Sequence, residues 1–299
     1  MVMITELSIL IPTYNSVAYP TAKKLYTLCE RIAMDAPHPF RYEIIVADDG
    51  SEDSNTVDAN QAINFLGNSR FIVKSQNSGS AATRNFLAQQ SQYEWLLFID
   101  SDMEIPGMDY IMRYLPCDQT DVTNGGIKVG GSWETHHHNL RYIYEKDSEP
   151  AHTVDKRQAV CFREFRSTNF LIRRACMLAH PFDERFKKSG YEDVFLGKTL
   201  HDAGATIMHI NNPLILNDFE DNETFVRKTE RNMMTLYHFR KELKGYSRLI
   251  DNTNSLTAFL LQLWHHVFGR LERHNLTSRH PRLWVYTLYR VGFFCSLKD

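Results

Sequence analysis

The sequence has little of what marks secreted or membrane-spanning proteins. Its 299 residues include only five cysteines, none in a Cys-x-x-Cys spacing, so we predict neither a disulfide framework nor a structural zinc site. No window approaches about 18 uninterrupted apolar residues, which argues against a segment that spans a bilayer. The segment from Met1 to Leu7 lacks the positive charge and the apolar run of a signal peptide. These absences predict a cytoplasmic protein with reduced thiols.

The low net charge and the absence of complete phosphate-binding motifs exclude further classes of protein. The net charge is −2, so no overall basic field attracts nucleic acid, and we expect no nucleic-acid partner. No Gly-x-Gly-x-x-Gly occurs, which argues against a dinucleotide-binding dehydrogenase. Gly197-Lys198-Thr199 looks like the end of a P-loop, but the position of the required earlier glycine holds Glu192. What remains is an ordinary globular composition, 43% hydrophobic and 23% charged.

Short apolar runs alternate with helical periodicity in the first third of the chain. The expected strands are residues 7–12, 42–47, 70–74 and 94–100, and the expected helices are 21–33, 58–66 and 80–90. Strands that alternate with helices form a mainly parallel sheet connected by crossover helices. We therefore predict an α/β fold of the Rossmann-like kind.

The second part of the chain is less regular. Strands are expected at 121–130, 168–172 and 205–210, and helices at 194–203 and 224–243. The stretch 132–164 is polar with little periodicity, so we predict a long mobile segment there. From about residue 246 the chain is helical. We predict one α/β domain over residues 1–243 and a helical extension over 244–299.

The helical extension carries an apolar stripe at spacings of three and four residues. Its members are Leu256, Phe259, Leu260, Leu263, Trp264, Val267, Phe268 and Leu271. The simplest interpretation is that this stripe packs on the rest of the protein. Two alternatives stay open, dimerisation and adsorption on the inner face of a membrane. In the second case the polar residues beside the stripe would face lipid headgroups. These residues are His265, His266, Arg270 and Arg273.

Two aspartates follow the apolar run Trp95 to Ile99 at a spacing of two residues. In an extended chain, Asp100 and Asp102 would point to the same side. They would stand at the carboxyl end of a buried strand, where open α/β sheets bind ligands. Two adjacent carboxylates repel each other unless a cation joins them, and a divalent ion that bridges to phosphate oxygens serves this purpose. The pair therefore indicates a metal-dependent nucleotide site.

Three other segments carry polar side chains that fit such a site. Asp48 and Asp49 follow the second expected strand and could accept a hydrogen bond from a nucleobase, or simply form a tight turn. Tyr14, after the first strand, could lie beside a base or belong to a surface loop. Arg84 stands one turn into a helix that follows Asn77-Ser78-Gly79, an arrangement able to bind phosphate.

An acidic pair, Glu192 and Asp193, precedes the helix expected from Val194. A carboxylate at a helix N-terminus can be a simple cap, because the helix dipole favours negative charge there. The functional alternative is that Asp193 acts as a general base toward a substrate hydroxyl.

Taken in order, these segments resemble those of the glycosyltransferase family 2 group, which has the GT-A fold. Each motif is weak alone, but seven in the right order and spacing, between about Leu7 and Leu243, are specific. The segments that carry the resemblance are 8–15, 43–53, 77–85, 100–102, 169–174, 182–186 and 192–193.

The resemblance implies an inverting transfer of a sugar from a nucleotide diphosphate donor, UDP-linked, in polysaccharide or glycoconjugate synthesis. Asp193 would be the base and Glu192 would orient the acceptor. The implied nucleotide-binding residues are Pro12, Tyr14, Asp48, Asp49, Asn77, Arg84, Asp100 and Ser101. A Mn²⁺ or Mg²⁺ ion would be held by Asp100, Asp102 and Asp218. Asp218 stands where family members often carry a histidine, and His209 is a second candidate.

Two alternative functions are a sugar nucleotidyltransferase and a non-catalytic nucleotide-sugar-binding protein. A sugar nucleotidyltransferase usually has a Gly-rich, basic loop after its first strand, and Pro12-Thr13-Tyr14-Asn15 stands there instead. A non-catalytic nucleotide-sugar-binding protein would not need Asp100, Asp102 and Asp193 intact. The acceptor could be a carbohydrate, a lipid-linked sugar or a protein, and we expect the polar stretch 132–164 to contact it.

Overall fold

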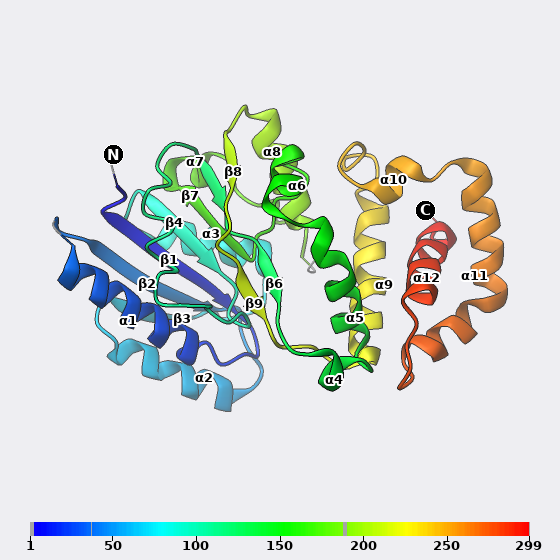
Figure 1. Cartoon of the computed structure of the whole chain (residues 1–299), viewed down its shortest axis with the longest axis horizontal. Helices are drawn as coiled ribbons and strands as arrows, with labels where there is room; N and C mark the ends of the chain where they lie inside the picture. Colours follow the sequence, from blue (N-terminus) through cyan, green and yellow to red (C-terminus); the bar gives the residue numbers. More distant parts are fainter. Residues whose placement is uncertain (1–2, 37, 188–189, 299) are drawn as a thin grey trace. The chain divides into compact units, whose positions relative to one another are not determined.

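The structure is a computed structural model that describes residues 3–36, 38–187 and 190–298 (Figure 1). Contacts divide the chain into two compact units. The first consists of Met1–Lys128 and Val154–Leu216, and the second of Val129–Thr153 and Asn217–Asp299. The second unit thus contains the expected helical extension together with earlier segments. The predicted division into a 1–243 domain and a 244–299 extension stays a prediction.

A seven-stranded sheet in the order β3-β2-β1-β4-β7-β5-β8 forms the centre of the first unit (Figure 1). All neighbouring strands are parallel except at β7, which runs antiparallel to both β4 and β5. The strands are β1 (Glu6–Thr13), β2 (Arg41–Asp48), β3 (Ser69–Val73), β4 (Trp95–Ile99), β5 (Val122–Asn124), β7 (Asn169–Arg173) and β8 (Ile207–His209). This arrangement confirms the predicted α/β class.

The central strands are mostly apolar, as expected where helices cover both faces of a parallel sheet, and the buried Ser8 of β1 donates to the buried Glu43 of β2 at 2.6 Å. Ile9 of β1 pairs with Ile44 of β2 and Leu97 of β4, and all three side chains are fully buried. Helix α1 contacts β2, and α3 contacts both β1 and β2. The helices of the first unit are α1 (Tyr19–Asp35), α2 (Ser54–Asn60), α3 (Ser80–Gln90), α6 (Val154–Ala159), α7 (Arg174–Ala179) and α8 (Glu192–Asp202), and a 3₁₀ helix, η1, spans Gln61–Phe65.

Two glycines divide the strand that we expected at 121–130. It becomes β5 and a separate β6 (Ile127–Val129), which pairs with β9 (Leu214–Leu216) in a two-stranded sheet. Gly126 has a φ of +86°, and a Cβ there would lie 2.7 Å from Arg157 Nη2. A Cβ on Gly125 would lie 2.2 Å from Tyr114 Oη. The chain therefore changes direction where only glycine fits.

The prediction of a long mobile segment over 132–164 is wrong. The stretch forms α4 (Trp133–His136), α5 (Leu140–Ser148), the 3₁₀ helix η2 (Glu149–Ala151) and α6. Asn139 caps α5, since its Oδ1 accepts a hydrogen bond from Tyr142 N at 2.9 Å. Leu140 and Tyr142 are buried. The helices are short and bury few residues each, so their periodicity is hard to recognise in the sequence.

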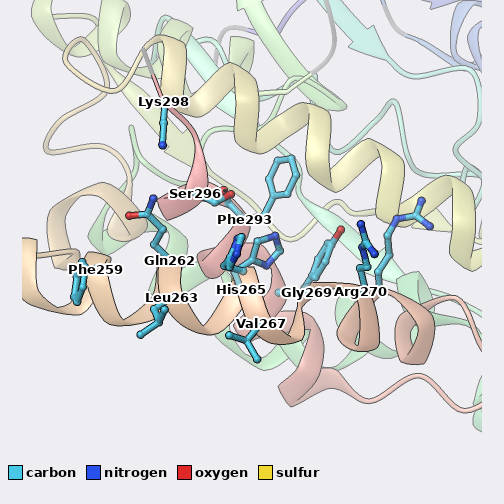
Figure 2. A pocket seen from close by; sticks show the side chains of 13 residues that line it. Phe259, Gln262, Leu263, His265, Val267, Gly269, Arg270, Phe293, Ser296 and Lys298 are labelled. Atoms are coloured by element: carbon cyan, nitrogen blue, oxygen red, sulfur yellow. Dashed lines mark hydrogen bonds between the residues drawn. The ribbon is translucent and has the colours of Figure 1, made fainter.

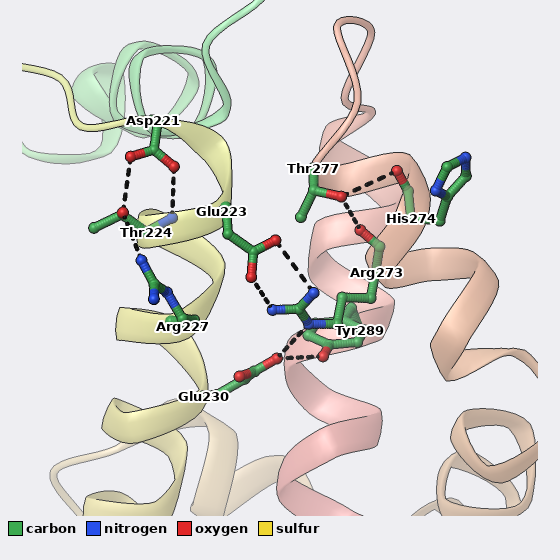
Figure 3. A network of polar contacts seen from close by, with 9 residues as sticks. All are labelled: Asp221, Glu223, Thr224, Arg227, Glu230, Arg273, His274, Thr277 and Tyr289. Carbon is green, nitrogen blue, oxygen red and sulfur yellow. Dashed lines mark hydrogen bonds and ion pairs between the residues drawn. The ribbon is translucent and has the colours of Figure 1, made fainter.

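The helices of the second unit are α4, α5, α9 (Asn222–His238), α10 (Arg248–Asn252), α11 (Ser255–Leu276) and α12 (Leu283–Ser296). Of these, α5, α9, α11 and α12 supply the residues of a small core. The core residues are Leu140, Phe225, Val226, Leu276, Val285, Tyr286 and Tyr289. At its edge, Arg273 of α11 pairs with Glu223 and with Glu230 of α9, and Tyr289 donates to Glu230 Oε1 at 2.6 Å (Figure 3). These ion pairs fasten α11 to α9.

The apolar stripe of α11 does not pack on the rest of the described chain, so that interpretation is wrong. Its side chains are exposed, from 37% for Phe268 to 69% for Leu256. The opposite side of the helix packs on α12, where a Cβ on Gly292 would lie 2.9 Å from His265 Cβ. We call the stripe the α11 apolar face; it consists of Leu256, Phe259, Leu260, Leu263, Trp264, Val267, Phe268 and Leu271. No helix within the described ranges is both long and apolar enough to cross a bilayer.

Candidate active site

The candidate site lies in the first unit, at the edge of the sheet where β1, β2, β3 and β4 end. Parallel strands bring their carboxyl ends to one edge, and the residues that follow them meet there. Tyr14 follows β1, Asp49 follows β2, Lys74 follows β3 and Asp100 follows β4. Because β7 is antiparallel, it starts at this edge, and Asn169 pairs with Ile99.

Asp49 is the centre of a buried hydrogen-bond cluster. Its Oδ1 accepts from Lys74 Nζ at 2.6 Å and from Ser78 N at 3.0 Å, and its Oδ2 accepts from Gly79 N at 2.8 Å. Burial alone would raise the pKa of Asp49, but the bonds from Lys74, Ser78, Thr83 and Gly79 hold it below its ordinary value. Asp49 therefore stays charged and ties the end of β2 to the start of α3.

Gly79 is required at the start of α3 by both its backbone and its surroundings. It has a φ of +93°, and a Cβ there would lie 2.6 Å from Lys187 O. L-residues other than glycine avoid this conformation. The loop 75–79 can therefore turn tightly and bring the first helical residue, Ser80, next to α8. Ser80 Oγ donates to Glu192 Oε1 at 2.9 Å.

Arg84, one turn further along α3, pairs with Asp100. Its Nη2 lies 2.5 Å from Asp100 Oδ1, and the arginine side chain is almost completely buried. Burial opposes the charge, but Asp100, Glu192 and Asp193 together raise the pKa of Arg84. Arg84 Nε is buried without a hydrogen-bond partner. One buried cation thus faces carboxylates from β4 and from α8.

The acidic pair of α8 lies in its first turn. The helix begins at Glu192, two residues earlier than expected, after Tyr191 in a left-handed conformation with φ 69°. Glu192 is buried, and its Oε2 accepts from Gly190 N at 2.6 Å. Burial and the neighbouring Asp193 raise the pKa of Glu192, and Arg84 opposes this. Asp193 is half-buried, and its Oδ1 accepts from Val194 N at 2.7 Å.

The remaining predicted nucleotide-binding residues differ in exposure. Asp48 is fully buried, and its oxygens accept from Ser51 N at 2.7 Å and Ser51 Oγ at 2.5 Å. Asp48 therefore forms a tight turn, the second of the two roles considered for it. Tyr14 is 43% exposed and Asn77 is exposed. The half-buried residues are Pro12 and Ser101. Asp48 and Asp49 thus support the loops, whereas Tyr14 and Asn77 have surface available to a ligand.

The extended-chain argument for Asp100 and Asp102 does not hold, because β4 ends at Ile99. Met103 N donates to Asp100 O at 3.3 Å, so the chain turns at Ser101 and Asp102. Asp102 is exposed, and Asp218 belongs to the second unit. Among the residues that the structure describes, no three His, Cys, Asp or Glu side chains form a group that could hold a metal ion.

His209 does not offer a free nitrogen to a metal. Its Nδ1 lies 2.7 Å from Arg157 Nη1 and its Nε2 lies 3.0 Å from Cys161 O. Because an arginine can only donate, Nδ1 accepts and Nε2 carries the proton. Burial, together with the Arg157 charge, lowers the pKa of His209 to about 4, although the Cys161 carbonyl acts in the opposite direction. His209 is a neutral core residue that orients Arg157.

The sequence reasoning missed two residues that organise the site. Lys74 pairs with Asp49, and Asn85 Nδ2 donates to Phe182 O and Glu184 Oε1, each at 2.9 Å. Asn85 thereby fastens the segment before α8 to α3. Lys74 follows directly after β3, just as Asp49 follows β2 and Asp100 follows β4. A search for polar residues directly after each expected strand could therefore have found it. A polar residue buried on a helix, such as Asn85, has no comparable signal.

A sheet of this order, with acidic side chains at its carboxyl edge, defines a fold of the GT-A type, and solved structures agree. The crystal structure of S. aureus TarS is 17% identical with a TM-score of 0.50, covering 95% of this chain and 54% of that one. The mannosyltransferase PcManGT from Pyrobaculum calidifontis, in complex with GDP-Man and Mn²⁺, is 14% identical with a TM-score of 0.52, covering 96% and 72%.

The family follows from the sequence comparison. The model of Glycosyl transferase family 2 matches residues 8–174, more than half of the chain, and the chain therefore belongs to this family. Among curated relatives, glycosyltransferase AglE of Haloferax volcanii is 24% identical over 208 residues, 67% of this chain and 62% of AglE. The poly(ribitol-phosphate) beta-glucosyltransferase of Bacillus spizizenii is 34% identical over 128 residues, 41% of this chain and 19% of that protein. The chain matches less than two thirds of the length of these relatives.

Proposed function

We propose that this protein transfers a sugar from a UDP-linked donor to an acceptor hydroxyl, with inversion at the anomeric carbon, in the synthesis of a polysaccharide or glycoconjugate. The observation that carries the proposal is the convergence of Asp100, Glu192 and Asp193 on the buried Arg84, inside the segment that matches the family. With a divalent cation bound at Asp100, such a cluster could hold a nucleotide diphosphate beside a carboxylate that receives a proton.

The nucleotide would lie along the carboxyl ends of β1, β2 and β4. Tyr14 and Asn77 are exposed and would contact it directly, together with Pro12 and Ser101. Asp48 and Asp49 are already used in hydrogen bonds within the protein. A base could therefore bond to Asp49 only beside these bonds or in exchange for one of them, so we assign both aspartates mainly to the shape of the loops.

Two carboxylates at the sheet edge have the ligand chemistry of a hard divalent cation, although no third acidic or histidine side chain among the described residues joins them. Carboxylate oxygens are the ligands that Mn²⁺ and Mg²⁺ prefer, and Asp100 and Asp102 supply them at the sheet edge. PcManGT, of similar fold, is a complex with Mn²⁺. When bound, the ion would neutralise charge on the departing diphosphate. Arg84 would hold Asp100 in place for this role.

Asp193 is the proposed general base, and Glu192 its positioning neighbour. Asp193 lies in the first turn of α8, where the helix dipole favours negative charge, and its carboxylate could accept the proton of an acceptor hydroxyl. Glu192 is fixed by Ser80 and by Gly190 N, which holds the start of α8 against α3. This connection would set the distance between the base and the donor.

The proposal is tested by incubating the full chain with a panel of UDP- and GDP-sugars and Mn²⁺. We expect UDP-sugars to raise the melting temperature and one of them to release UDP slowly by hydrolysis. Stabilisation by GDP-sugars alone would contradict the UDP assignment. Binding without any release would favour the non-catalytic alternative. Formation of a nucleotide sugar from a nucleoside triphosphate and a sugar 1-phosphate would favour the nucleotidyltransferase alternative.

A further inference from the structure

The α11 apolar face is a large unpartnered hydrophobic surface on the second unit. Eight apolar side chains within residues 256–271 are exposed by 37–69%. Figure 2 shows Phe259, Leu263 and Val267 on one side of α11, with Phe293 of α12 on the other. Exposed patches of this kind mark interaction sites because water solvates them poorly.

The segment of the chain that carries this face is predominantly positive. Residues 244–299 contain eight Lys or Arg and three Asp or Glu, a net charge of +5, whereas the whole chain has −2. The one acidic residue of α11, Glu272, is buried and accepts a hydrogen bond from Trp264 Nε1 at 2.7 Å. No exposed carboxylate of α11 therefore opposes an anionic partner.

A cavity of about 940 Å³ lies between α11 and α12, next to the apolar face. Its lining combines apolar residues, among them Leu263 and Val267, with His266 and the cations Arg270 and Lys298. Arg273 also lines it, but its guanidinium is used in ion pairs with Glu223 and Glu230. His266, Arg270 and Lys298 are exposed. Cations at the border of an apolar helix face are typical of helices that lie in a membrane interface.

We propose that the α11 apolar face docks on an anionic lipid bilayer, with the helix axis in the membrane plane. The apolar side chains enter the boundary between headgroups and acyl chains, and Arg270, His266 and Lys298 contact lipid phosphates. Charge decides between this occupant and a second copy of the chain. A symmetric dimer through this face would bring like charges together, whereas anionic lipids complement them.

Flotation of the full chain with vesicles tests the proposal. We expect binding to vesicles of phosphatidylcholine with phosphatidylglycerol, and much weaker binding to phosphatidylcholine alone. The double variant Leu263→Glu, Val267→Glu should lose at least about tenfold in affinity. The matched control is Phe65→Glu, since Phe65 is 89% exposed on the first unit and should leave binding unchanged.

A charge variant measures how much electrostatic attraction contributes to vesicle binding, apart from the contribution of the apolar side chains. Arg270→Glu should weaken binding to the anionic vesicles about tenfold and leave the weak binding to neutral vesicles unchanged. Lys23→Glu, an exposed site on α1, is its control. If circular dichroism shows that the double variant is unfolded, Leu256→Glu at the exposed start of α11 replaces it.

Two results would overturn the proposal. One is a wild-type chain that fails to float with anionic vesicles. The other is a wild-type dimer in light scattering that the Leu263→Glu, Val267→Glu variant converts to a monomer, without vesicle binding by either. That result would assign the face to a second copy of the chain.

Discussion

Arg84 and Asp100 form an ion pair, with Nη2 2.5 Å from Oδ1, that joins the first turns of α3 to the end of β4. The guanidinium is almost fully buried and also faces the carboxylates of Glu192 and Asp193. A buried charge of this kind is stable only while its partners remain, and its partners repel one another once it is removed.

The first prediction concerns the stability that depends on Arg84. Replacing Arg84 by Met leaves three carboxylates around an uncharged side chain, so we expect the free energy of unfolding to fall by about 3 kcal/mol. Urea denaturation measures this. Arg31→Met removes an exposed pair with Asp35 on α1 and should cost less than about 1 kcal/mol. Equal losses in the two variants would contradict the assigned importance of Arg84.

The second prediction concerns the loop that Asp49 holds. Asp49→Asn keeps the size of the side chain but removes the charge that Lys74, Ser78 and Gly79 bind. We expect a loss of about 2 kcal/mol in unfolding free energy, together with weaker donor binding in titration calorimetry. Asp58→Asn on the exposed side of α2 is the control. If Asp49→Asn binds the donor as tightly as wild type, the loop is not part of the nucleotide site.

The third prediction tests the general base. Asp193→Asn should lower the rate of transfer about a thousandfold, because the amide cannot accept the proton, while donor affinity changes little. Asp202→Asn at the end of the same helix, where Asp202 pairs with Lys198, provides the matched control. Turnover at the wild-type rate in Asp193→Asn would reject the assignment.

The fourth prediction tests the metal site. Asp102→Ala should weaken nucleotide binding in the presence of Mn²⁺ at least about tenfold and leave binding without metal unchanged. Calorimetric titrations with and without Mn²⁺ measure the two affinities. Asp109→Ala, an exposed aspartate paired with Arg113 nearby in the chain, should behave like wild type. A loss of affinity that does not depend on Mn²⁺ would argue against a ligand role.

The fifth prediction is a pH dependence of stability from His209. Its pKa is lowered to about 4 in the folded chain from the ordinary 6.5. The unfolded chain therefore takes up the proton first, so this contribution is complete above pH 6.5 and is lost as the pH falls toward 4. It amounts to at most about 3 kcal/mol. The difference in unfolding free energy between pH 7 and about pH 4.5 should be smaller in His209→Gln than in wild type or in the exposed control His38→Gln.

Regular elements with continuous apolar runs were predictable from the sequence. Helix α3 spans Ser80–Gln90 as expected, and β1 to β4 lie within two residues of their predicted ends. Strands buried on both faces need apolar residues at most positions, and this leaves a clear signal in the sequence. The acidic residues after β2 and β4 were found for the same reason, because a strand that ends abruptly in aspartate shows where the sheet edge lies.

What the sequence could not provide was the partner of each polar side chain. Asp49 and Asp48 look alike in the sequence, yet the side chain of Asp49 binds the lysine that follows β3, and that of Asp48 binds Ser51 of its own turn. The turn after Ile99 also contradicts the strand-like spacing assumed for Asp100 and Asp102. Such pairings depend on how separate segments meet in space, and no local pattern encodes them.

Helix α3 has a consequence for how charge is shared across the candidate site. Its Ser80 contacts Glu192, and its Arg84 contacts Asp100, so one short rigid element connects carboxylates from both sides of the sheet edge. A cation bound to Asp100 would neutralise the carboxylate that now offsets the charge of Arg84. The positive charge of Arg84 would then act more strongly on the carboxylates of α8. The proton affinity of Glu192 would then fall, so a cation bound at the end of β4 would change the electrostatics at the start of α8.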